Sequence, residues 1–191
     1  MIKIIKVFLR IFSQILIKFN FFNLAQYISS IRASLLIRKN VKVSFDGEDW
    51  IYKWENSGAV SSTCYYDPNF NYSDLDLFFY KYSPQSGDII LNIGVENGAE
   101  IPEFCKLVGS NGKVFAIEAD PSCCRRLEKL KKILDLTNLI IINVAVGSIE
   151  GKIKLSQEEN EMSNSVIRNQ SYKSNFIEVE QKRLDKILEP F

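Results

Sequence analysis

Residues 87–122 constrain the fold more than any other part of the chain. A short apolar run at 88–93 has the pattern of a parallel strand that is buried on both faces. Glycines then interrupt it, a helix is expected over 99–108, and a second apolar, β-branched run follows at 113–117. Glu118 comes directly after that run. This order of strand, glycine turn, helix, strand and acid predicts the first half of a nucleotide-binding α/β unit.

The glycine spacing and the acid together limit the ligand that this unit can bind. Glu118 lies twenty residues after Gly98, close to the separation at which a dinucleotide fold places an acid against a ribose. A carboxylate suits a diol because it accepts a charge-assisted hydrogen bond from each hydroxyl. Gly94 and Gly98 form G-x-x-x-G, however, rather than the G-x-G that brings backbone against a pyrophosphate, and Glu96 adds negative charge. We therefore expect a ligand with a ribose and a positive centre but no phosphate.

Three segments around this unit resemble the FkbM-type S-adenosylmethionine-dependent methyltransferases. They are LNIGVENG at 91–98, VFAIEADPS at 114–122 and INVAVGS at 142–148. The resemblance covers about residues 41–188 and implies an α/β, Rossmann-like class I methyltransferase fold with S-adenosylmethionine as the cofactor. It implies cofactor contacts from Asn92, Gly94, Glu96, Asn97, Gly98, Glu118, Asn143 and Ala145. By this resemblance the turn lies beside the amino-acid part of the cofactor, Glu118 holds the ribose, and Asn143 to Ala145 lie near the adenine.

Asn92 departs from the family pattern, which usually has an aspartate at this position. An aspartate would help to balance the cofactor's cationic ammonium group, whereas asparagine offers hydrogen bonds without the charge. We expect weaker cofactor binding rather than none, because Glu96 remains nearby.

A second departure concerns the end of the sequence. The family continues with a strand that carries D-x-E-G after a segment like VEQKRLDKIL at 179–188, and here the sequence ends at Phe191. We therefore expect an incomplete Rossmann-like sheet in which the strand at 88–93 is an unpaired edge. The chain would then be a fragment, a truncated gene product or one half of a site completed by a partner subunit. No catalytic residue can be assigned.

The first 45 residues segregate positive charge. Eight lysines and arginines and no acid precede Asp46. A helix over this region would place one polar stripe among Ile, Leu, Val and Phe residues; the stripe consists of Lys3, Lys6, Arg10, Gln14 and Lys18. Such a helix suits an anionic membrane surface. Packing on the domain or on a second subunit is an equal alternative, whereas a spanning helix or a cleaved signal peptide is disfavoured because Arg10 and Lys18 interrupt the apolar run.

Composition fits a globular domain with an N-terminal extension, since the 191 residues are 46% hydrophobic and 25% charged. We expect a basic amphipathic helical extension at 1–40 and a lead-in with strands and an aromatic-rich cover at 41–86. Residues 87–191 would form the N-terminal half of the cofactor-binding domain. The polar stretch at 156–175 is either a lid over the cofactor or an ordinary surface loop.

Side-chain chemistry excludes several classes of site. The chain has no histidine and no C-x-x-C pair, so no metal site is expected. The four cysteines fit buried thiols in a reducing compartment, which places the protein in the cytoplasm or at the inner face of the membrane. Cys123 and Cys124 could have lowered thiol pKa values because they would lie at a helix start. The basic helix at 121–136 is expected to be solvated, and no nucleic-acid partner is expected because no binding motif accompanies the charge.

Two functions remain after these exclusions. The first is S-adenosylmethionine-dependent O-methylation of a sugar, glycan or other small hydroxyl compound. The alternative is a non-catalytic, truncated remnant that acts as a membrane-associated or subunit-binding module.

Overall fold

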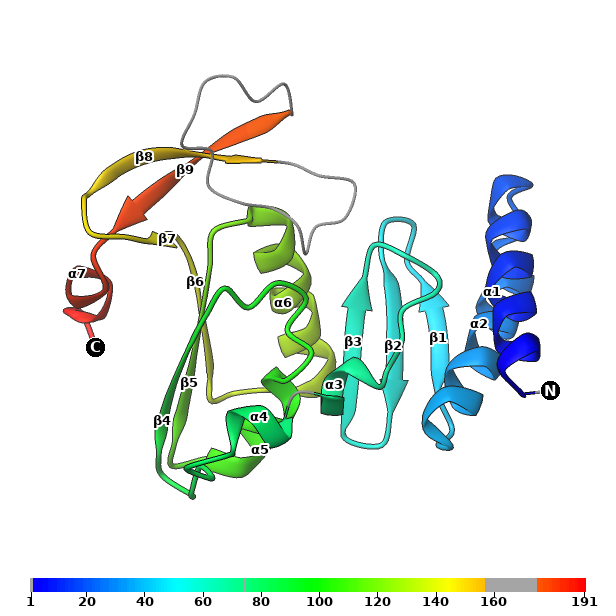
Figure 1. Cartoon of the computed structure of the whole chain (residues 1–191), viewed down its shortest axis with the longest axis horizontal. Helices are drawn as coiled ribbons and strands as arrows, with labels where there is room; N and C mark the ends of the chain where they lie inside the picture. Colours follow the sequence, from blue (N-terminus) through cyan, green and yellow to red (C-terminus); the bar gives the residue numbers. More distant parts are fainter. Residues whose placement is uncertain (1, 74, 157–174) are drawn as a thin grey trace.

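The computed structural model describes residues 2–73, 75–156 and 175–191 (Figure 1). Its helices are α1 (Ile2–Lys18), α2 (Phe22–Ile37), α3 (Phe70–Ser73), α4 (Leu75–Phe78), α5 (Ile101–Val108), α6 (Pro121–Leu134) and α7 (Leu184–Leu188). Its strands are β1 (Lys42–Phe45), β2 (Trp50–Trp54), β3 (Ser57–Ser61), β4 (Ile89–Ile93), β5 (Lys113–Glu118), β6 (Leu139–Asn143), β7 (Ala145–Val146), β8 (Gly151–Ser156) and β9 (Phe176–Lys182). No helix in these ranges is long and apolar enough to cross a membrane.

The predicted α/β unit is present. Strands β4, β5 and β6 form a parallel sheet in that order, and α5 and α6 connect them. Both helices pack on one face of the sheet, where Ile101 and Leu127 meet Val114 and Ala116 in one apolar cluster. Each of these four side chains is almost fully buried. The topology is that of the first three strands of a Rossmann-like fold, so the fold class predicted from the sequence is confirmed.

Local sequence explains where the two crossover helices begin. Pro102 lies in the first turn of α5, where its missing N–H costs no helical hydrogen bond. Asp120 caps α6, because its carboxylate accepts the backbone N–H of Ser122 at 2.7 Å. Helix α5 ends where predicted and begins two residues later than predicted, at Ile101. Helix α6 begins where predicted and ends two residues earlier, at Leu134.

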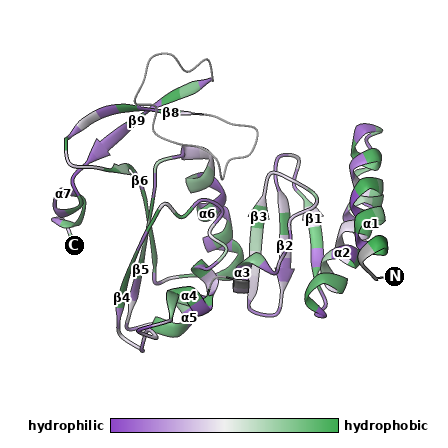
Figure 2. Ribbon diagram, viewed as in Figure 1, coloured by the Kyte–Doolittle hydropathy of each residue, from purple (hydrophilic) through white to green (hydrophobic). Residues whose placement is uncertain are grey.

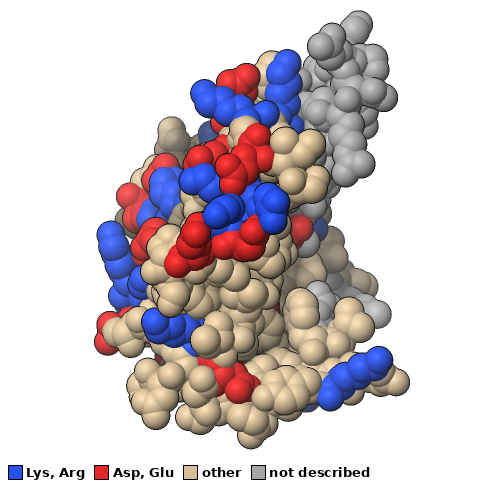
Figure 3. Space-filling view, turned by 90° about the vertical axis from the view of Figure 1, so that its left-hand side faces the viewer, with Lys and Arg blue, Asp and Glu red and all other residues tan. Residues whose placement is uncertain are grey.

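The opposite face of the sheet is covered over β5 but open over β4. Ile117 packs with Ile187 of α7, and Phe115 meets the ring of Phe191 edge to face. On β4, by contrast, Ile89 is 66% exposed and Ile93 is 49% exposed. Figure 3 shows charged side chains gathered over one end of this side of the molecule and a largely uncharged region beside them. Within the described residues β4 pairs with β5 alone, as expected for an edge strand.

The chain beyond β6 forms a separate small sheet. The strand β6 ends before Val144, and the short strand β7 that follows pairs in parallel with β9. Strand β8 pairs antiparallel with β9. The predicted loop at 156–175 falls almost entirely outside the described residues.

The N-terminal helices and the antiparallel sheet β1–β2–β3 share one core. Helix α1 packs on α2, where Ser29 donates to Ser13 at 3.3 Å, and α2 packs on β1. Tyr52 and Trp54 of β2 are fully buried in this core. The sheet lies between the helix pair and α6, so α1 is far from the parallel sheet (Figure 1).

The sequence predicts that the basic face of α6 is solvated. In the structure this face is instead paired with the β1–β2 turn. Arg125 and Lys129 approach the buried carboxylate of Asp49 at 2.7 and 2.6 Å. Lys129 also lies 2.6 Å from Asp46, and Arg125 lies 2.6 Å from Glu48. These ion pairs join the antiparallel sheet to the parallel one. The sequence could not show this contact, because its partners are about eighty positions apart.

The ion pairs shift the pKa values of both aspartates. Hydrogen bonds from the Asp49 N–H and from Lys129 lower the pKa of Asp46 from 3.8 to about 2. Burial alone would raise the pKa of Asp49, but the hydrogen bonds from Arg125 and Lys129 outweigh it and lower the value. Both aspartates therefore stabilise the fold when they are ionised.

Replacing Asp49 should lower the free energy of unfolding and should also make that free energy less dependent on pH in the acid range. We expect Asp49→Asn to lower the free energy of unfolding at pH 7 by about 2 kcal/mol, because charge-assisted hydrogen bonds are lost. Since the folded pKa values lie below the ordinary 3.8, this stabilisation is complete above about pH 4 and is lost as the pH falls toward 2. Urea unfolding at several pH values measures both effects. Glu128→Gln, at an exposed position of α6, serves as the control, and an Asp49→Asn variant with the wild-type acid dependence would contradict the prediction.

Candidate functional site

The glycine turn lies between β4 and α5, at the carboxyl end of the parallel sheet. Gly94 and Gly98 have φ angles of 76° and 67°, and Glu96 between them has a φ of 52°. These left-handed conformations suit glycine but strain a residue with a Cβ atom. The Gly94 N–H donates to the carbonyl of Ile117 at 2.9 Å, which fixes the turn against β5.

Gly94 and Gly98 differ in how much space surrounds their Cα atoms. A Cβ atom on Gly94 would meet nothing within 4 Å, so this position opens onto free space, and its contact with the cofactor stays a prediction. A Cβ atom on Gly98 would overlap the side chain of buried Leu127 in α6. Gly98 therefore allows close packing of the turn on α6, and its predicted contact with the cofactor remains a prediction.

Glu118 holds the glycine turn from the tip of β5. Its Oε2 accepts the backbone N–H of Glu96 at 2.8 Å, and its Oε1 accepts the N–H of Asp120 at 2.8 Å. The residue is 8% exposed. Each carboxylate oxygen has a further lone pair, so these two bonds leave capacity for a diol. The predicted role on the ribose stays a prediction.

A small cavity next to the turn is acidic. It encloses 240 Å³, and its wall includes Asn92, Gly94, Glu96, Asn97 and Glu100. Burial raises the pKa of Glu96, and the nearby charges of Glu118 and Glu100 raise it further. This concentration of carboxylates favours a cationic group in the cavity.

Glu100 is a site residue that the sequence analysis missed. The amide of Asn92 donates to its carboxylate, so Glu100 supplies a negative charge beside the position where the family usually has an aspartate. No sequence pattern signals this bond, because it forms only when the turn after β4 brings Glu100 back to Asn92.

The two residues predicted near the adenine lie in different surroundings. Asn143, at the end of β6, donates to the carbonyls of Glu118 and Ala119 at 2.9 and 3.0 Å. It thereby holds the backbone that presents Glu118. Ala145 is buried and packs with Leu155 and other apolar residues of the third sheet. Contact of either residue with a ligand stays a prediction.

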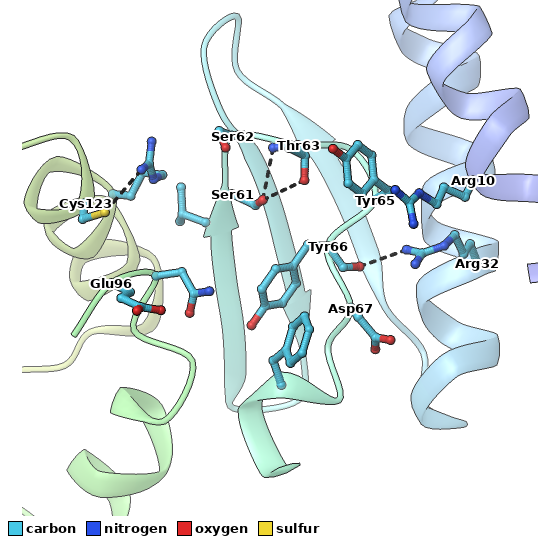
Figure 4. A pocket seen from close by; sticks show the side chains of 14 residues that line it. Arg10, Arg32, Ser61, Ser62, Thr63, Tyr65, Tyr66, Asp67, Glu96 and Cys123 are labelled. Carbon is cyan, nitrogen blue, oxygen red and sulfur yellow. Dashed lines mark hydrogen bonds between the residues drawn. The ribbon is translucent and has the colours of Figure 1, made fainter. Parts of the chain in front are cut away.

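A second, larger cavity adjoins the first. It encloses 490 Å³ between the antiparallel sheet, the N-terminal helices and the glycine turn (Figure 4). Phe70, Glu96 and Asn97 line both cavities, so the two spaces meet at the turn.

Cys123 and Cys124 are buried thiols, as the sequence indicated, and the start of α6 does not lower their pKa values. Burial raises the pKa of Cys123 and of Cys124 to about 12. Both side chains are buried, and removal from water outweighs any help from the helix terminus.

Comparison with known proteins gives partial structural matches. No family model matches the chain, and no curated protein matches it in sequence. A SAM-dependent methyltransferase from Aquifex aeolicus is 22% identical over 41% of this chain and 47% of its own, with a TM-score of 0.36. A protein-L-isoaspartate O-methyltransferase is 23% identical over 54% of this chain and 28% of its own, with a TM-score of 0.35. Fibrillarin from Aeropyrum pernix, with natively bound S-adenosyl-L-methionine, is 20% identical over 55% of this chain and 57% of its own, with a TM-score of 0.32.

The matched region therefore spans less than two thirds of each of these three proteins. Two of them are methyltransferases by name, and the third holds bound S-adenosyl-L-methionine. The resemblance to the FkbM type in particular is not matched by a family model and stays a prediction.

The two glycines of the turn should respond differently to the same substitution. Gly94→Ala should cost about 1 kcal/mol of stability, because only the positive φ is strained. Gly98→Ala should cost about 2 to 4 kcal/mol, because Leu127 must also move in a packed core. Thermal and urea unfolding of the two variants measures this difference, and equal losses would contradict the packing role of Gly98.

Proposed function

We propose that the chain binds S-adenosylmethionine in the acidic cavity beside the glycine turn. The observation that carries the proposal is the junction of Glu118 with this turn. The tip of one parallel strand presents a carboxylate, and the preceding crossover presents a left-handed backbone at Gly94 with open space above it. A ribose could donate its two hydroxyls to Glu118 while the rest of the ligand lies along the turn.

Charge supports this cofactor over a nucleotide phosphate. Glu96 and Glu100 line the cavity and repel phosphate, Glu118 lies close to Glu96, and Asn92 adds no positive charge. S-adenosylmethionine carries a sulfonium and an ammonium group, and both are stabilised by nearby carboxylates. Glu100 takes over the charge that Asn92 lacks.

We propose further that the methyl group is transferred to a hydroxyl of a sugar or other small acceptor in the adjoining cavity. The carbon–sulfur bond would break with its electron pair going to sulfur, a carbon–oxygen bond would form, and the hydroxyl proton would leave. Glu96 lines both cavities and is the carboxylate best placed to take that proton. Methyl transfer from a sulfonium depends mainly on in-line placement, so two adjoining cavities are a suitable arrangement.

Cofactor binding tests the proposal directly. Calorimetry should detect binding of S-adenosylmethionine and S-adenosylhomocysteine to the full chain. Glu118→Gln should weaken both affinities by about tenfold or more, because one charge-assisted hydrogen bond is lost and another is weakened.

The choice of variants separates binding from folding. Glu118→Gln keeps one oxygen that can accept a turn N–H, whereas Glu118→Ala removes both acceptors. Glu128→Gln, on the exposed face of α6, should bind like the wild type. No heat at millimolar ligand with a folded wild-type chain would reject the proposed cofactor.

We propose separately that α1 attaches the protein to an anionic membrane surface. The helix packs on α2, yet Ile4, Val7, Phe8 and Ile11 remain between 50% and 74% exposed. Figure 2 shows these hydrophobic segments of α1 at the outer end of the molecule. The absence of any acid before Asp46 gives this end a positive charge that complements anionic lipid. This observation favours a bilayer over a protein partner.

Vesicle binding tests the attachment. The chain should sediment with phosphatidylserine-containing vesicles and much less with pure phosphatidylcholine. The double variant Phe8→Ser, Ile11→Ser should lose about tenfold or more of this affinity, because two apolar side chains no longer insert. Ile89→Ser removes an equally exposed apolar residue on β4 and should bind like the wild type. A concentration-dependent dimer that the double variant abolishes, without vesicle binding, would assign this face to a second subunit instead.

A further inference from the structure

Two arginines from the N-terminal helices reach into the larger cavity. Arg10 of α1 and Arg32 of α2 line the wall that lies opposite the glycine turn (Figure 4). Their helices lie outside the parallel sheet, so the cavity combines parts of both halves of the chain.

Arg32 is a buried cation with an unsatisfied donor. It is 7% exposed, and its Nη1 donates to the carbonyl of Tyr66 at 3.0 Å. Its Nε has no hydrogen-bond partner among the described residues. Buried donors are nearly always satisfied, so the unpaired Nε leaves Arg32 with unused hydrogen-bonding capacity beside the cavity that it lines.

Arg10 adds a second guanidinium to the same wall. Its Cζ lies 4.4 Å from the centroid of the Tyr65 ring, which orients the planar group by a cation–π contact. Neither Arg10 nor Arg32 forms an ion pair with a carboxylate in the described part of the chain.

The charges around Arg32 leave it poorly balanced. Burial lowers the pKa of Arg32, Arg10 lowers it further, and Tyr52 and Asp67 oppose the shift. Arg126 also lines the cavity, but it is engaged with Ser122 and lies 3.9 Å from Asp49. Asp67 also lines the cavity and offsets part of the charge of Arg32, but no ion pair joins it to Arg10 or Arg32 within the described residues.

The opposite wall carries the acidic glycine turn together with Cys123 and Arg126 of α6, and Arg126 is already engaged there by Ser122 and Asp49. Glu96 and Asn97 of the glycine turn line it, and both residues also line the cofactor cavity. Ser61, Ser62 and Thr63 lie along the side between the two walls (Figure 4). A ligand with an anionic end and a hydroxyl end matches this polarity.

We propose that the larger cavity binds the methyl acceptor through an anionic group, a phosphate or a carboxylate, held by Arg10 and Arg32. The inference rests on the proposed function, since it names the class of acceptor as an acidic hydroxyl compound. A guanidinium pair suits such groups because its planar donors match their oxygen atoms. The hydroxyl end of the acceptor then lies toward Glu96 and the cofactor cavity.

Calorimetry on the full chain with three probes tests the inference. Glucose 6-phosphate and glucuronate distinguish phosphate from carboxylate, and glucose is the neutral control. We expect at least one of the two anions to bind and glucose not to bind. Arg10→Gln should weaken anion binding by about tenfold, and Arg32→Gln by at least as much, because a charge-assisted hydrogen bond is lost in each case. Lys42→Gln removes one charge from an exposed position of β1 and should have no effect.

Folding and cofactor binding are measured separately. Arg32 also bonds to Tyr66, so circular dichroism checks that variant, while the exposed Arg10 carries the test if Arg32→Gln unfolds. Anion affinity should be unchanged or higher in the presence of saturating S-adenosylhomocysteine.

Each result bears on one proposal. Displacement of the anion by S-adenosylhomocysteine would overturn the inference, because the arginines would then hold the cofactor's carboxylate. Cofactor binding without arginine-dependent anion binding would overturn the inference alone. Arginine-dependent anion binding without cofactor binding would confirm the anion site and reject the methyltransferase proposal.

Discussion

The arrangement of the antiparallel sheet β1–β2–β3 and the parallel sheet β4–β5–β6 depends on the buried carboxylate of Asp49. Asp49 of the antiparallel sheet receives Arg125 and Lys129 of α6, and the larger cavity lies between the units that these ion pairs join. Removing a carboxylate from water is costly, and the cost is offset only when close hydrogen bonds replace the lost solvation. The contacts of Asp49 with Arg125 at 2.7 Å and with Lys129 at 2.6 Å meet that condition. The relative position of Arg32 and Glu96, which belong to different units, follows from them.

Glu118 plays a comparable role within the parallel sheet. The carboxylate that we propose for the ribose also accepts the N–H of strained Glu96, so the same residue shapes the turn and presents a binding group. Asn143 holds the Glu118 carbonyl from the next strand. The site is therefore organised by backbone hydrogen bonds before any ligand arrives, which reduces the ordering cost of binding.

Local patterns in the sequence predicted the parallel unit because its determinants are local. The apolar runs of β4 and β5, Pro102 in the first turn of α5 and the Asp120 cap of α6 act over a few residues each. The pairing of α6 with Asp49, the burial of Cys123 and the bond between Asn92 and Glu100 depend on tertiary contacts. No periodicity encodes such contacts, so the sequence did not predict the pairing of the basic face of α6, although it did indicate buried cysteines.

Helix α1 takes part both in the proposed membrane attachment and in the proposed anion site, because one side of it lines the larger cavity and another is exposed. Arg10 turns toward the larger cavity and stacks on Tyr65, whereas Phe8 and Ile11 remain exposed on the helix. A helix that lies on a lipid surface by its apolar side would hold the cavity close to that surface. An acidic acceptor carried by the membrane could then reach Arg10 and Arg32 without crossing bulk solvent. The basic N-terminal extension would in that case recruit the acceptor as well as attach the protein, because α1 carries both Arg10 and the exposed apolar side chains.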